Sequence, residues 1–282
     1  MGLQIATNIG ALNAYRNLAH NQLQGSKSLE KLSSGLRINR AADDAAGLAI
    51  SEGLKSQVNG LNVAARNAQD GISVIQTAEG ALTEVHSILQ RMRDLAVQGG
   101  SDANNADSRT AIAKEAGELS KELYRVSQST NFNGIDLLKG GTALTFQVGS
   151  GATANDKIDV ALADVPTAVG TLASADGVAV GAGFDVTSNT TAQATITAID
   201  AAIKNVSSQR AGLGAAQNRF ESAVNSLNVS AENLSAANSR IRDTDMASEM
   251  VKYTASNILQ QAGTAMLAQA NQSGQGVLQL LR

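Results

Sequence analysis

The chain has 282 residues, a formal net charge of −3 and no cysteine. The charge gives no electrostatic reason to expect nucleic acid binding, and the missing cysteines exclude disulfides and thiol chemistry. Only 2% of the residues are aromatic and tryptophan is absent, whereas a compact core of this size normally uses aromatic volume. Long, thin helical packing needs less bulk, so the composition favours an extended helical protein.

The start of the chain does not have the pattern of a secretory leader. Met1–Asn8 lacks a basic segment followed by an uninterrupted apolar one, so we expect no cleaved secretory signal. Elsewhere Gln, Asn or Ser breaks every apolar run before it reaches the length of a bilayer. We therefore also expect no membrane insertion.

Both ends of the chain carry apolar residues at helical spacing but almost no charge. Arg16 is the only Lys, Arg, Asp or Glu before Lys27, and none occurs from Tyr253 through Leu281. Helices on the surface of a monomer usually carry charge on their wet face. We expect terminal segments that are disordered in the lone chain and helical once copies of the chain pack together. The apolar positions are Ile5, Ile9, Leu12, Tyr15, Leu29, Leu32, Leu36, Met246, Met250, Tyr253, Ile258, Ala262 and Met266.

Charged breaks separate these ends from the rest of the chain. Ser33–Asp44 interrupts the helical pattern after the N-terminal segment, and Arg240–Asp245 occupies the matching place before the C-terminal one. We predict an inner domain of residues 1–42 with 243–282 and an outer helical domain of residues 43–242. Asp43 and Asp44 are expected to cap the first helix of the outer domain, because anions favour that end.

A long helix is predicted from Leu54 to Ala96. Its apolar positions step by threes and fours with one stammer at Ala78, which is the spacing of a helix that follows a partner helix. At ~1.5 Å per residue it is about 65 Å long. The positions are Leu54, Val58, Leu61, Ala65, Ala68, Ile72, Ile75, Ala78, Leu82, Val85, Leu89, Met92 and Ala96.

Shorter elements are predicted in the centre of the chain. Gly99–Gly100 ends the long helix, and a third helix follows with Asp107 or Ser108 as its N-cap. Its apolar positions are Ile112, Ala116, Leu119, Leu123 and Val126. Asn133–Gly134 predicts a turn.

Period-two alternation predicts a β-hairpin after that turn. Its strands are Leu144–Val148 and Ile158–Leu162. Residues 163–192 are expected to form a few short strands or an irregular segment. We place the hairpin and this segment together as a small tip, at about residues 134–192.

The second long helix is predicted from Ile196 to Ile241. Because it matches the first in length and lies in the opposite half of the chain, we expect an antiparallel pair. The positions are Ile196, Ile199, Ile203, Val206, Arg210, Leu213, Gln217, Phe220, Val224, Leu227, Ala231, Leu234, Asn238 and Ile241. The three polar members either fix the register of the pair or are partly exposed, and the pattern leaves both open. The fold class is therefore mainly α, a long antiparallel coiled-coil-like bundle with a small β-hairpin tip and the terminal helices paired as a separate inner layer.

We find no pattern of catalytic, metal-binding or cofactor-binding residues. His20 and His86 have no neighbour at metal-ligand spacing, and Gly149–Gly151 lacks the Gly-Lys-Ser/Thr ending of a phosphate loop. We expect neither an enzyme nor a cofactor. Loop hydroxyls are possible positions for O-linked sugars: Thr187, Ser188, Thr190 and Thr191.

Several long motifs closely resemble bacterial flagellin. They are Ile5–Asn8, Leu32–Asn39, Ala41–Ile50, Asn131–Gly134 and the ending Val277–Arg282. The resemblance covers about residues 1–150 and 195–282 and leaves room for only a small central tip, as in a minimal flagellin without large outer domains.

The resemblance implies a structural, self-assembling subunit of the flagellar filament, used for swimming motility and located outside the cell. It implies export as an unfolded chain by the flagellar type III apparatus, a cytoplasmic chaperone on the C-terminal segment, and contacts with filament cap and hook-junction proteins. The terminal helices would pack around a central channel. The filament-core residues implied are Ile5, Ile9, Leu12, Met250, Ile258, Met266, Leu278 and Leu281.

The resemblance also implies a surface that the vertebrate Toll-like receptor for flagellin recognises in the monomer. Arg91, Leu95 and Glu115 fall at the family's main contact positions, and packing between stacked subunits is the other use of that surface. The nearest alternative function is a hook–filament junction protein. An enzyme-bearing flagellin and a secreted coiled-coil effector fit less well, because the centre is short and both ends match one polymer.

Overall fold

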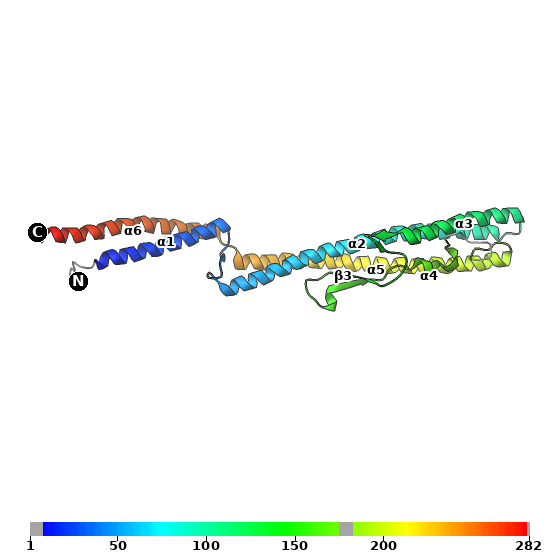
Figure 1. Cartoon of the computed structure of the whole chain (residues 1–282), viewed down its shortest axis with the longest axis horizontal. Coiled ribbons are helices and arrows are strands. Elements are labelled where there is room, and N and C mark those ends of the chain that lie inside the picture. Colours follow the sequence, from blue (N-terminus) through cyan, green and yellow to red (C-terminus); the bar gives the residue numbers. More distant parts are fainter. Residues whose placement is uncertain (1–7, 175–182, 281–282) are drawn as a thin grey trace. The chain divides into compact units, whose positions relative to one another are not determined.

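A computed structural model describes residues 8–174 and 183–280, with side chains described as far as residue 272. The described chain is mainly helical with two small antiparallel hairpins, which confirms the predicted fold class (Figure 1). It divides into two compact units, Met1–Val58 with Glu232–Arg282, and Asn59–Ala231. These boundaries lie inside the long helices, whereas the predicted domain boundaries lie at helix ends. Each unit is described by itself below.

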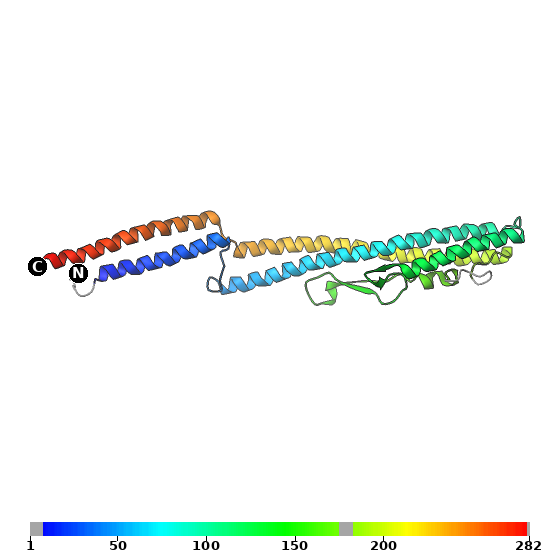
Figure 2. The same cartoon turned by 45° about the horizontal axis from the view of Figure 1, so that its top comes forward.

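The first unit is built on the terminal helices α1 (Ile9–Ser34) and α6 (Met246–Leu280), which lie side by side in Figures 1 and 2. The Asn8 side chain caps α1 by accepting a hydrogen bond from the Ala11 amide. Gly35 ends the helix in the left-handed region, with φ at 73°, where a residue without Cβ is favoured. Asn8 also donates its side-chain amide to the Ala270 carbonyl at 2.9 Å, which places the start of α1 beside the last part of α6.

The contact between α1 and α6 uses small and polar residues. Cα atoms of the two helices come within 8 Å of each other, and a Cβ added to Gly25 would lie only 3.7 Å from Ser256 Cβ. A Cβ on Gly263 would lie 3.2 Å from Leu18 Cδ1. The buried and half-buried positions include Ala11, Ala14, Leu18, Asn21, Gly25, Ser28 and Leu32 on α1, and Glu249, Tyr253, Ser256, Gln260, Gly263, Leu267 and Ala270 on α6. Both series step by threes and fours, which is the spacing of a heptad repeat. Most of the seam residues, however, are small or polar, whereas the seam of a coiled coil is apolar.

The charged breaks join the helices of the first unit. Leu36 and Asp243 form an antiparallel bridge, and the Arg37 amide donates to the Arg242 carbonyl. Asp44 caps α2 by accepting from the Gly47 amide at 2.9 Å, as predicted. Asp43 does not share this role, because its carboxylate accepts from the amides of the turn before the helix, and these bonds lower its pKa.

The second unit contains most of α2 (Ala45–Gly99) and α5 (Asn189–Arg242), together with α3 (Ala106–Ser129). The predicted long helices are confirmed, and α2 ends at the predicted glycine pair. Their stripes form one core in which Leu82, Val85 and Leu89 are fully buried. The N-cap of α3 is Asn105, not Asp107 or Ser108, because the Asn105 side chain accepts from the Ser108 amide.

Ion pairs connect α2 to α5 within the second unit. Arg210, predicted to interrupt the stripe, donates through Nε and Nη2 to Glu79 at 3.0 and 2.7 Å. Arg93 and Asp200 form a second pair at 2.6 Å. Gln217 instead donates to Glu221 on its own helix, so of these two stripe positions only Arg210 connects the helices.

The described chain has two hairpins, and the sequence predicted the turn of the first and the strand pairing of the second. β1 (Asn131–Phe132) and β2 (Ile135–Asp136) flank the predicted turn, where Asn133 and Gly134 have φ of 50° and 80°. β3 (Leu144–Gln147) pairs antiparallel with β4 (Lys157–Val160).

The second hairpin forms, but it does not lie at one end of the long helices, where we predicted it. It lies alongside α2 and α5 in both views, with the Gln147 carbonyl bonded to Asn67 and Phe146 against Phe220 (Figures 1 and 2). The apolar face of so small a sheet needs cover, and the helices supply it. After the hairpin come α4 (Val165–Val169) and the 3₁₀ turn η2 (Gly170–Leu172). For this segment the sequence predicted a few short strands or an irregular structure and missed the short helix.

Replacing Phe220 with Ala is expected to lower the free energy of unfolding of the second unit by about 3–5 kcal/mol. Phe220 is fully buried, it meets the Phe146 ring edge-to-face at 5.4 Å, and it fills the space left by Gly71. Urea unfolding followed by circular dichroism measures the change. Val229→Ala, at a 58% exposed position on the same helix, is the control, and equal destabilisation by both changes would contradict this packing.

Candidate assembly surfaces

The terminal helices expose large apolar side chains that nothing in the described chain covers. Among the predicted filament-core residues, Ile9 is 57% exposed, Leu12 52%, Met250 49%, Ile258 61% and Met266 64%. Leu278 lies within α6, and Ile5 and Leu281 lie outside the described residues. Further exposed apolar side chains on these helices are Tyr15, Leu23, Leu29, Met246, Val251 and Leu259. The predicted apolar stripe is thus largely outside the α1–α6 seam.

The apolar side chains of α6 point in several directions. At about 100° per residue, Met250, Ile258 and Met266 lie roughly 100°, 180° and 260° around the helix from the buried Glu249. A helix that is apolar on all sides is stable in water only when other chains or helices surround it. Large apolar side chains are therefore exposed on both flanks of α6 and on its outer side.

Glu249 is the one charged side chain that is buried in the described residues, with 4% exposed, and sequence reasoning missed it. Burial alone would raise the pKa of its carboxyl group. Hydrogen bonds from the Ser28 hydroxyl and the Lys252 ammonium group, with the charge of Lys31, outweigh burial and hold the pKa below its ordinary value. The signal available in the sequence was its position as the last acidic residue before a charge-free segment.

The three residues predicted for receptor recognition and axial packing occupy two different environments. Arg91 on α2 and Glu115 on α3 form an ion pair at 2.6 Å, with side chains 55% and 46% exposed. Leu95 is 1% exposed and belongs to the core of the second unit. In this conformation a partner can touch Arg91 and Glu115, whereas Leu95 supports the helices that present them.

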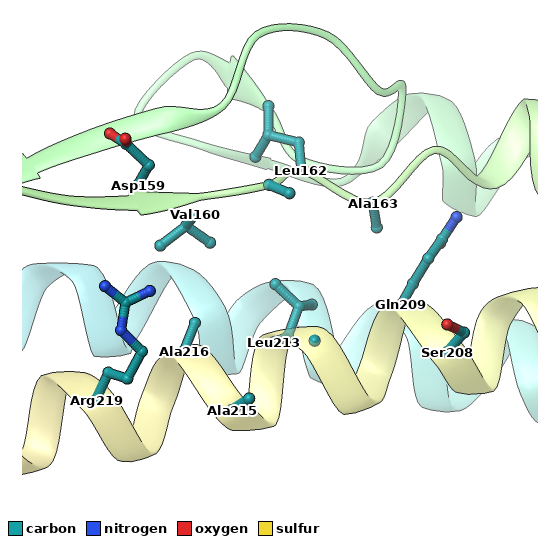
Figure 3. A pocket seen from close by; sticks show the side chains of 12 residues that line it. Asp159, Val160, Leu162, Ala163, Ser208, Gln209, Leu213, Ala215, Ala216 and Arg219 are labelled. Carbon is teal, nitrogen blue, oxygen red and sulfur yellow. The ribbon is translucent and has the colours of Figure 1, made fainter.

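A groove of the second unit lies between the β4 strand with its following segment and α5 (Figure 3). It has a volume of about 380 Å³, with Asp159 and Arg219 toward one end and Gln209 toward the other. The middle is apolar, with Val160, Leu162 and Leu213.

The described histidines and acidic residues do not assemble a metal site. His86 Nε2 lies 2.9 Å from Gln90 Nε2, and His20 is exposed. Across residues 8–174 and 183–280 no three His, Cys, Asp or Glu side chains gather closely enough to hold a metal ion. In the same part of the chain, none of the helices has the length of uncharged apolar sequence that a bilayer crossing needs.

Comparisons with known proteins cover both halves of the chain. Residues 5–143 match the bacterial flagellin N-terminal helical region, and residues 196–281 match the bacterial flagellin C-terminal helical region. A flagellin of Halalkalibacterium halodurans is 52% identical over 276 residues, which cover 98% of both chains. A flagellin of Bacillus subtilis is 47% identical over 304 residues, covering 99% of this chain and 100% of that protein.

Among solved structures, a putative flagellar hook-associated protein from Vibrio parahaemolyticus has a similar fold. The TM-score is 0.58 at 13% identity, over 71% of this chain and 100% of the other. At this identity the likeness concerns the fold alone.

Acidification is expected to loosen the α1–α6 pair through Glu249. Because its pKa is lower in the folded chain than in the unfolded one, the ionised carboxylate stabilises the pair above the unfolded pKa. This contribution disappears as the pH falls through the folded pKa, so the free energy of opening should decrease from pH 6 to pH 3. Hydrogen exchange of α6 amides, corrected for intrinsic exchange rates, measures this free energy of opening.

Glu249→Gln is the matched variant, since it keeps the shape and removes the ionisable group. It should show a weaker dependence of opening on pH than the unaltered chain. An unchanged dependence would show that other carboxylates carry the effect, Asp43 being the first to examine.

Proposed function

Because this chain belongs to the bacterial flagellin family, it is a structural filament subunit, and we propose that it polymerises through its terminal helices into the extracellular filament used for swimming. The observation that carries this mechanism is the exposed apolar surface of α1 and α6. Ile9, Ile258 and Met266 are each more than half exposed, although the charge that keeps a surface helix soluble is missing around them.

The helix pair is suited to be an inner layer of such a polymer. Its seam is closed by Gly25 and Gly263, so the large apolar side chains remain free for other copies. Burying an apolar side chain of this size contributes about 1.5–3 kcal/mol, and each subunit offers many of them. Repeated identical contacts then stabilise a helical array.

Export and delivery follow from the same property. A chain with uncharged, apolar ends risks assembling inside the cell, so we propose that a chaperone covers α6 in the cytoplasm. Passage as an unfolded chain through the flagellar type III apparatus agrees with the absence of cysteine, because no disulfide has to form or break. Filament cap and hook-junction proteins are the proposed partners at the two ends of the polymer.

The Arg91–Glu115 surface is the proposed position of axial packing between subunits and of recognition of the monomer by the vertebrate Toll-like receptor for flagellin. Both side chains are about half exposed and of opposite charge, so they can exchange their mutual ion pair for pairs with a partner. An assembled filament would then cover the surface that the receptor reads.

A hook–filament junction protein remains the second candidate. The putative flagellar hook-associated protein from Vibrio parahaemolyticus has a fold similar to that of this chain, at 13% identity. Two flagellins, in contrast, match nearly the whole chain at 52% and 47% identity. A filament subunit elongates long filaments, whereas a junction protein does not. The next experiment measures elongation.

Removal of residues 253–282 should abolish elongation from short filament seeds while leaving the second unit folded. The deletion takes away most of α6, including Ile258 and Met266, but no residue of the second unit. Electron microscopy measures filament length, and circular dichroism measures the remaining helix. Normal elongation by the truncated chain would disprove the terminal-helix mechanism.

A point variant separates loss of contact from loss of the helix. Ile258→Asp should reduce elongation at least about tenfold, because burial of an unpaired carboxylate is costly. Ile258→Leu keeps the apolar volume and should elongate normally. If the two variants elongated equally, Ile258 would not lie in a buried contact.

Arg91→Ala should weaken receptor signalling by the monomer without altering its fold, because the side chain is exposed and its surface ion pair is worth at most about 1 kcal/mol. Leu95→Ala should instead destabilise the second unit by about 2–5 kcal/mol. A reporter cell assay and thermal unfolding separate the two effects. Unchanged signalling by Arg91→Ala would remove this surface from receptor recognition.

A further inference from the structure

The methionines of this chain fall into two groups by exposure. Four of the five lie in the described residues, and Met92 among them is fully buried in the second unit. Met246 is 47% exposed, Met250 49% and Met266 64%. All three belong to α6, and they lie on both of its flanks. Since the sequence has no cysteine, methionine thioethers are its only oxidisable sulfur.

A peroxide reacts with such a thioether in a balanced two-electron step. The O–O bond of hydrogen peroxide breaks, one oxygen becomes bonded to the sulfur, and the other leaves as water. The sulfur loses two electrons and the peroxide gains them. The product, methionine sulfoxide, is polar and chiral, and methionine sulfoxide reductases convert it back to the thioether.

We propose that Met246, Met250 and Met266 form a reversible oxidation site that controls whether a subunit can assemble. The inference rests on the proposed function, because it requires these side chains to become buried against other copies. A sulfoxide oxygen carried into that contact is a strong acceptor that is costly to bury without a partner. Around Met266 the sequence offers no charged partner, since no Lys, Arg, Asp or Glu occurs from Tyr253 through Leu281. An oxidised subunit is therefore excluded from the polymer until a reductase restores it.

The same geometry predicts protection after assembly. In the monomer three thioethers face solvent, whereas in the polymer neighbouring copies would cover them as the core of the second unit covers Met92. Oxidation therefore acts on chains that have not yet been added, and it leaves an existing filament intact.

The test treats the full-length monomer with hydrogen peroxide, removes the oxidant with catalase, and maps sulfoxides by peptide mass spectrometry. Met246, Met250 and Met266 should oxidise faster than Met92. Addition to filament seeds should then slow by roughly tenfold or more, since a buried polar group without a partner is costly. Incubation with a methionine sulfoxide reductase and a dithiol should restore the rate.

Two leucine variants supply the control, because Leu replaces Met at nearly equal volume. The triple variant M246L, M250L and M266L should elongate at the normal rate after peroxide treatment, whereas M92L should remain sensitive. The proposal is overturned if the treated triple variant is inhibited as strongly as the unaltered chain. It is also overturned if the oxidised, unaltered chain elongates normally.

Elongation without peroxide treatment distinguishes a failure of this inference from a failure of the proposed polymerisation. If the untreated chain does not elongate on seeds, the proposed polymerisation fails and the oxidation site fails with it. If the untreated chain elongates and oxidation has no effect, only the oxidation site is lost.

Discussion

The exposed apolar surface of α6 is the feature on which the behaviour of the whole chain depends. Apart from its seam with α1, α6 carries large apolar side chains on both flanks and on its outer side, and most of its length has no charge. Such a helix is unstable in water unless other helices cover those sides. α1 covers one side only, so the apolar side chains on the remaining sides are exposed in the described chain. The family to which the chain belongs supplies such a surrounding, because its members build filaments.

The two units meet the same need for burial in different ways. In the second unit, Leu82, Leu89 and Phe220 fill the space between helices, and ion pairs such as Glu79–Arg210 join α2 to α5. That unit therefore has its own core. In the first unit, the small residues of the seam bring backbones together but bury little apolar area. The first unit is accordingly expected to open more readily than the second unit.

Sequence patterns predicted the long helices well, because large apolar residues at threes and fours coincide there with buried positions. They located the α1–α6 seam poorly for the opposite reason. The buried positions of that pair include Gly25, Ser28 and Glu249, while the apolar residues that draw attention, such as Leu12 and Ile258, face outward. Periodicity alone identifies an apolar face and cannot say whether the chain itself or another copy covers it. The place of the second hairpin was missed because pairing of strands depends on local alternation, whereas its docking on Phe220 depends on residues far away in the chain.

Because α1 and α6 approach each other closely, an engineered disulfide could link the two helices. Paired cysteines need Cβ atoms about 3.5–4.5 Å apart, and positions 25 and 256 offer 3.7 Å. Since the chain has no thiol of its own, an engineered disulfide placed there could be opened with a reductant and closed again with an oxidant, without side reactions at other cysteines. Position 25, where glycine allows α1 and α6 to approach closely, would thus also allow the two terminal helices of a subunit to be linked and released by experiment.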